Sequence, residues 1–193
     1  MANYNKKISD SVIRIGEVRF CYAHVFSPRT GDDGAPGKYG VQILVPKDNE
    51  QAVKLIRDAI ESAKERGKTT RWGGKIPPAS KLRLPLRDGD EEYPDDDTYA
   101  GQWFFNANSV SAPGVRVLEN GLMSEALDQD DFYSGCYGCA TVSIYPYESN
   151  GNMGVGASLN NVIKIRDGER FSGITSAEDD FADLCEADAA CLD

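Results

Sequence analysis

Apolar and polar positions alternate with a period of two along most of this chain, which is typical of β-strands. The longest alternating stretch covers residues 134–168 and is interrupted once, at Ser149-Asn150-Gly151-Asn152. Asn-Gly favours a two-residue hairpin turn because both residues tolerate a positive φ. The stretch therefore predicts a long β-hairpin.

The two faces of the first hairpin arm differ in character. Val142, Ile144 and Pro146 share one face, whereas Tyr145 and Tyr147 lie among hydroxyl side chains on the other. Two aromatic rings on a solvated strand face suit stacking on unpaired bases. Tyrosine also favours strands for packing reasons alone, so both interpretations of these rings stay open.

The remaining elements point to a barrel. Residues 11–26 form a strand whose apolar phase changes at Gly16-Glu17, which predicts a bulge and a bend. A long bent first strand lets a small closed barrel use one strand on both sides. Residues 39–45 form the next strand, and Asp48 begins a helix that ends near Arg66, with Gly67 as its stop. We expect a mainly β fold, a five-stranded barrel with one capping helix and extra hairpins.

Charge divides the chain into a body and a tail. The 193 residues carry a net charge of −10, but all 21 Lys and Arg lie at or before Arg170. Residues 177–193 hold seven carboxylates without a base, and residues 64–87 hold eight bases against one acid. We expect a folded domain over residues 1–175 and a flexible acidic tail over residues 176–193.

Cations and aromatic rings occur together at several places that suit a single nucleic-acid strand. Trp72 stands in a glycine-containing basic loop, where it either stacks on a base or packs under the loop as a core residue. Residues 81–87 predict a strand with leucines on one face and bases on the other. Phe104 occupies the polar face of a strand over residues 99–108, which predicts an exposed ring. The candidate contacts are Arg29, Lys38, Arg71, Trp72, Lys75, Lys81, Arg83, Phe104, Tyr145 and Tyr147.

Two alternatives remain at this point. Cys21, His24, Cys136 and Cys139 have spacings that zinc sites use, and the same residues offer a cysteine nucleophile with the only histidine. However, residues three apart on a strand face opposite sides, and free cysteines are commonly buried. We therefore expect no enzyme, metal or cofactor. The other alternative is a virion or scaffold component whose barrel packs against copies of itself.

The expected location is a reducing cytoplasm. No run of eighteen apolar residues is present to span a membrane, and the first residues lack a signal-peptide core. An odd number of cysteines, five, agrees with free thiols. Self-association is left open by the sequence.

Several short motifs resemble a family of phage single-stranded DNA-binding proteins, first catalogued as a domain of unknown function. The resemblance is strongest in Phe132–Gly135, Val142–Tyr147, Gly151–Val155, Leu159–Val162 and Ser176–Phe181. It implies an OB-fold barrel that coats unpaired DNA during phage replication and recombination in the cytoplasm of a bacterial host. The residues by themselves fit the same type of barrel.

The resemblance also gives the tail a function. Related phage proteins use acidic tails that often end in an aromatic residue, whereas this chain ends in Cys191-Leu192-Asp193. We expect the tail to recruit replication or recombination proteins and to compete with DNA for the basic groove. Its candidate contacts are Glu178, Asp179, Asp180, Phe181 and Asp183. A tail that only improves solubility is the alternative.

Overall fold

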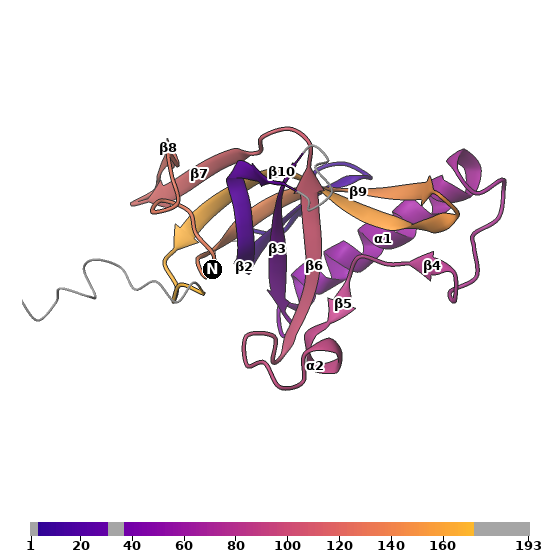
Figure 1. The fold of residues 1–193 in the computed structure, drawn as a ribbon, viewed down its shortest axis with the longest axis horizontal. Coiled ribbons are helices and arrows are strands. Elements are labelled where there is room, and N and C mark those ends of the chain that lie inside the picture. Colours follow the sequence, from indigo (N-terminus) through magenta and orange to yellow (C-terminus); the bar gives the residue numbers. More distant parts are fainter. Residues whose placement is uncertain (1–3, 31–36, 172–193) are drawn as a thin grey trace, which may run out of the picture.

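The computed structural model describes residues 4–30 and 37–171. The predicted tail, residues 176–193, lies outside the described residues, and so does the boundary expected at residue 175. The described part is built mainly from strands, with one long helix beside them (Figure 1).

Five strands close into an OB-like barrel, as predicted. They pair in the order β6-β3-β2-β9-β10, and the barrel closes where Ser158 of β10 pairs in parallel with Asn108 of β6. Figure 1 shows β2, β3 and β6 side by side, with the β9–β10 hairpin extending to one side. The five strands are β2 (Val12–Arg29), β3 (Lys38–Pro46), β6 (Gln102–Ser109), β9 (Tyr137–Ser149) and β10 (Asn152–Arg166).

Strand β2 serves both sides of the barrel because it bends. Its pairing with β9 shifts between Ile15 and Val18, and Glu17 has φ 56° there, so the predicted bulge is confirmed. A second shift, between Cys21 and His24 in the pairing with β3, was not predicted. Tyr22 lies at this second bulge with φ 49°.

The long hairpin is confirmed, and its turn has the expected backbone. Ser149 pairs with Asn152, and the two residues between them have φ values of 50° and 75°. Val142 and Ile144 are fully buried in the main core, as the alternation predicted.

Helix α1 (Glu50–Thr70) covers one end of the barrel, but its ends differ from the prediction. Asn49, not Asp48, is the N-cap: its side chain accepts from the Ala52 amide and donates to the Gly16 carbonyl. Gly67 does not stop the helix. A Cβ atom at Gly67 would lie 2.6 Å from the Trp72 ring, so glycine is needed there for close packing.

The strand predicted over residues 81–87 is wrong. Pro85 cannot donate a ladder hydrogen bond, and the segment splits into two short strands with Leu84 43% exposed between them. The minor elements are β1 (Lys6–Lys7), β4 (Leu82–Arg83), β5 (Arg87–Asp88), α2 (Gly89–Glu92), β7 (Gly114–Glu119) and β8 (Leu122–Glu125).

A second, smaller apolar cluster lies on the outside of the barrel. It consists of Cys21, Leu44, Tyr99 and Phe104, with Phe171 packed against it. Cys21, Leu44 and Phe104 come from β2, β3 and β6, and the turn that carries Tyr99 covers them. Within residues 4–30 and 37–171, no helix has the length and apolar character needed to cross a membrane.

Candidate nucleic-acid interface

A groove crosses the outer face of β3 and β6 beside the second half of β2. Gly40 pairs with Asn108 and Gln42 with Asn106, so small and amide side chains form its floor. The hollow has a volume of about 380 Å³. Its other walls include Tyr22, His24, Arg29, Lys38, Tyr93 and Tyr99.

Tyr22 is the most exposed ring of this groove. The residue is 63% exposed, because the second bulge of β2 turns its side chain away from the barrel. Tyr22 and His24 also line a second hollow, together with Ser134 and Phe171. The Tyr22 ring therefore borders two adjoining hollows, and it is accessible for stacking on a base.

Two cations stand at one end of the groove. Arg29 and Lys38 are cross-strand partners, and both are exposed. Within the described residues neither of them has a carboxylate at ion-pair distance. The structure places these two predicted residues at the groove, where two exposed cations suit phosphate.

A buried hydrogen bond supports the floor of the groove. The Tyr99 hydroxyl donates to Gln42 Oε1 at 2.6 Å. Burial raises the pKa of Tyr99, so its hydroxyl stays a neutral donor. Tyr93 stacks on Tyr99 with 4.3 Å between ring centroids, and it keeps part of its own ring accessible.

The predicted tyrosines of the hairpin lie on the same outer surface. Ser158 pairs with Asn108, which connects the groove floor to the outer face of β10. There Tyr145, 44% exposed, lies over Gly156, and Tyr147 lies over Gly154. A Cβ at Gly156 would come within 2.9 Å of the Tyr145 ring, so glycine lets the ring lie flat on the neighbouring strand.

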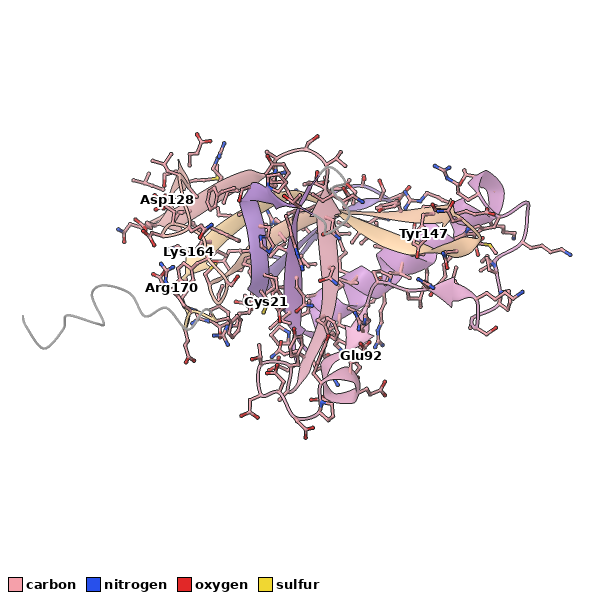
Figure 2. The ribbon with its side chains drawn as sticks, viewed as in Figure 1. Cys21, Glu92, Asp128, Tyr147, Lys164 and Arg170 are labelled. Atoms are coloured by element: carbon pink, nitrogen blue, oxygen red, sulfur yellow. The ribbon has the colours of Figure 1, made fainter. Side chains whose placement is uncertain are left out.

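The basic residues near the hairpin fall into two groups. Arg83 of β4 pairs with Gly154, so the structure brings it beside Tyr147, with Lys81 just before it in the sequence. Arg71 and Lys75 are exposed at the end of α1. Figure 2 shows Tyr147 on the hairpin arm, well away from Cys21 in the body of the barrel.

Trp72 is not an exposed stacking ring. It is 8% exposed and packs against Gly67 of α1, and its Nε1 donates to the Tyr147 carbonyl at 3.3 Å. The ring fills the space between the helix end and the hairpin, where a large apolar surface is best removed from water. Trp72 therefore supports the arm that carries Tyr145 and Tyr147.

Phe104 is also buried, at 0% exposed, which corrects the prediction of an exposed ring. The rings of Tyr93 and Tyr99 lie 5.5 and 5.2 Å from its centroid, because the turn before β6 folds over this face. The Arg87 guanidinium lies 4.7 Å from the ring. Phe104 thus supports the side of the groove and does not form its surface.

The cysteines do not form a metal or nucleophilic site in the described part of the chain. No three His, Cys, Asp or Glu side chains there are grouped so as to hold a metal ion. Burial raises the pKa of Cys21 to about 12 and those of Cys136 and Cys139 to about 11. Such thiols are protonated at neutral pH and are poor nucleophiles.

The fold and groove define a class of protein. A five-stranded closed barrel with an open face on its second and third strands is the architecture of OB-fold proteins that bind oligonucleotides. The chain belongs to the family described as Enterobacter phage Enc34, ssDNA-binding protein, which matches residues 11–191. The resemblance seen in the sequence is therefore confirmed.

Similar proteins agree with this assignment. The chain is 32% identical over 188 residues to putative protein p50 of Acyrthosiphon pisum secondary endosymbiont phage 1, covering 91% of this chain and 95% of the relative. The single-stranded DNA-binding protein of bacteriophage Enc34, solved in complex with ssDNA, is 27% identical with a TM-score of 0.75, covering 89% and 96%. The bacteriophage T7 protein gp2.5 shares the fold, at 17% identity and a TM-score of 0.52 over 93% and 94%.

Sequence reasoning missed several groove residues: Tyr22, His24, Gln42, Tyr93, Asn106 and Asn108. The amide residues could have been recognised in the sequence, since they occupy the same face of two strands that pair. Tyr22 could not, because its exposure depends on a bulge within an apolar strand. Tyr93 stands in an acidic run, which concealed its role.

Proposed function

We propose that this protein binds single-stranded DNA with little sequence preference and binds duplex much more weakly. The main supporting observation is the groove, where an exposed aromatic ring and exposed cations share an open barrel face. The related Enc34 protein was solved with ssDNA on the same fold, which also favours this function. A strand of this kind needs stacking surfaces and cations but no recognition helix.

The proposed mechanism separates two kinds of contact. Arg29 and Lys38 neutralise phosphates at the groove, and Arg83, Lys81, Arg71 and Lys75 do so near the hairpin. Bases stack on Tyr22 in the groove and on Tyr145 and Tyr147 along the hairpin. Each stacked base contributes about 1–3 kcal/mol without depending on base identity.

We further propose a role in phage DNA replication and recombination in the host bacterial cytoplasm. The acidic tail would recruit partner proteins and compete with DNA. Phe171, the last described residue, lines the hollow beside Tyr22 and precedes the first residue of the proposed tail by five positions. The proposed tail contacts, Glu178, Asp179, Asp180, Phe181 and Asp183, follow within twelve positions.

A direct titration tests the proposal. Fluorescently labelled single strands of different sequence, a matched blunt duplex and a matched RNA strand are titrated with the full chain. We expect similar affinities for the DNA single strands and far weaker binding of the duplex. Equal affinity for duplex and single strand would contradict the stacking mechanism. Failure to bind any strand at low salt would instead favour a structural component that assembles with its own copies.

A further inference from the structure

A row of side chains crosses four strands on the outer face of the barrel. Leu44 of β3 is the cross-strand neighbour of Arg19 in β2, Arg19 is the neighbour of Tyr137 in β9, and Tyr137 is the neighbour of Arg166 in β10. Directly paired residues point to the same face. Leu44 packs with Cys21 under the groove region, so the row extends from there toward the end of the molecule that carries Arg166.

Aromatic rings hold the two arginines of this row in place. The Arg166 guanidinium carbon lies 3.8 Å from the Tyr137 ring centroid, and the Arg19 carbon lies 5.2 Å from the same ring. Arg19 also lies 4.0 Å from the centroid of Phe171. Stacking fixes the planes of both guanidinium groups but leaves their N–H edges available.

Within the part of the chain that the structure describes, most donors of these two arginines have no acceptor. Arg19 donates to the carbonyls of Gly135 and Glu169, each at 3.0 Å, which leaves three of its five N–H groups. Arg166 has no hydrogen-bond acceptor among the described residues, and neither arginine has a carboxylate at ion-pair distance there. Nearby arginines differ: Arg170 pairs with Asp130, and Arg116 with Glu125.

The row adjoins the groove through Phe171. This ring stacks on Arg19 and also lines the hollow that Tyr22 and His24 border. Figure 2 places Lys164 and Arg170, on either side of Arg166 in the sequence, at the end of the molecule opposite Tyr147. Lys164 and Arg170 therefore lie on the opposite side of the barrel body from the hairpin arm.

We propose that Arg19, Tyr137 and Arg166 form a second binding station for single-stranded DNA, at which the two guanidinium groups neutralise phosphates of nucleotides beyond the groove. A strand would run from the hairpin arm through the groove, pass Phe171 and reach Arg166. This inference rests on the proposed function and defines how far a bound strand extends. A fixed guanidinium with free N–H edges is suited to phosphate.

The test uses the full chain and a ladder of labelled oligo-dT from about 4 to about 16 nucleotides, the range that OB folds cover. Arg166→Ala is compared with the native protein across a salt series. We expect equal binding of the shortest strands. Beyond a threshold length, the variant should bind more weakly, with a salt slope shallower by about 0.7 because one phosphate is no longer neutralised.

Two further variants make the result specific. Arg57→Ala is the matched control, since Arg57 is an exposed arginine 5.0 Å from the Trp103 ring on a different element, α1. It should match the native protein at every length. Arg166→Lys keeps the charge but loses the planar stacked group, so it should keep the salt slope and regain part of the affinity.

Two other results would each overturn the second station, and a third would overturn the proposed function. If Arg166→Ala matches the native protein at all lengths while the native protein binds, the second station is wrong and the proposed function stands. If Arg166→Ala tightens binding at low salt, the arginine holds the acidic tail and not DNA, which also overturns the second station. If the folded native protein binds no strand at any length, the proposed function itself fails.

Discussion

Tyr22 combines a backbone conformation that is uncommon for a tyrosine with high exposure. A non-glycine residue at positive φ is uncommon, and the second bulge of β2 fixes it there. The result is a ring that cannot pack on its own strand and therefore projects into the groove region.

Replacing Tyr22 tests its stacking role. We expect Tyr22→Ala to weaken binding of a single strand by about 1–3 kcal/mol, the contribution of one stacked base. Tyr22→Phe keeps the ring and should bind almost as well. Fluorescence anisotropy with a labelled oligonucleotide measures both, and thermal melts should show little change because the side chain is exposed. Native affinity in Tyr22→Ala would exclude this ring from the interface.

The buried thiols give a prediction about reactivity. Burial raises the pKa values of Cys136 and Cys139 to about 11 and that of Cys21 to about 12. A raised pKa means that the reactive thiolate is scarce at pH 8 and increases only as pH rises toward that value. We expect iodoacetamide to leave these three cysteines unlabelled in the native protein at pH 8 and to label them in urea. Peptide mass spectrometry distinguishes them, and rapid native labelling of Cys136 would contradict its burial.

Individual residues show where sequence reasoning reached its limit. The alternation correctly placed Val142 and Ile144 inside and Tyr145 outside. It failed for Phe104, because strand parity shows which face a residue occupies but not what covers that face. Trp72 stands in a loop without strand parity, so the sequence left both stacking and packing open, and the helix end covers the ring. The sequence pattern alone does not show where the tertiary structure adds a second layer over an outer face.

For individual elements, the predictions were reliable where a short sequence feature determines the backbone conformation. The Asn150-Gly151 turn and the phase change at Gly16-Glu17 both appear where predicted. The second bulge of β2 has no glycine and no phase signal, and it depends on pairing with β3. The strand over residues 81–87 was predicted from leucines on one face and bases on the other. Pro85 is compatible with an edge strand or a bulge, but here it lies between two separate short strands.

The basic flank of the hairpin supports a prediction at this scale. The double variant Lys75→Ala with Arg83→Ala should weaken DNA binding and make the salt slope shallower by about 0.7 for each phosphate that is no longer neutralised. Lys54→Ala is the control, because Lys54 is an exposed cation of α1 that pairs with Asp58 at 2.6 Å. If the double variant keeps both the affinity and the slope, the strand does not follow the hairpin arm.

At the scale of the whole molecule, barrel closure connects surfaces that are distant in the sequence. The pairing of Ser158 with Asn108 joins the hairpin face to the groove floor, and the row through Arg19 extends the same outer surface. The sequence showed the charge segregation but not this continuity. These side chains come from strands that are distant in the sequence, and the pairing of those strands places them on the outer face of the barrel.

The acidic tail is the last whole-molecule feature. Residues 177–193 carry seven carboxylates, and Phe181, Leu184 and Leu192 are their only large apolar side chains. Such a segment buries too little apolar surface to fold by itself. If the tail competes with DNA as proposed, its tethering to the domain would give its carboxylates a local concentration of about millimolar. We expect weak charge pairing with Arg29 and Lys38 to become significant at that concentration.

Truncation after Thr175 tests the competition. We expect the shortened chain to bind a single strand more tightly than the full chain, with the largest difference at low salt. The reason is screening, since the Debye length falls from ~30 Å at 0.01 M to ~8 Å at 0.15 M. Truncation should also abolish recruitment of a replication partner, measured by co-purification from infected cells.

A full-length chain with residues 177–193 shuffled is the control. It keeps the charge, so it should still compete with DNA. A partner that recognises Phe181 among its acidic neighbours should no longer co-purify with it. If truncation leaves DNA affinity unchanged at 0.01 M salt, the tail does not occupy the groove and acts only on partners or solubility.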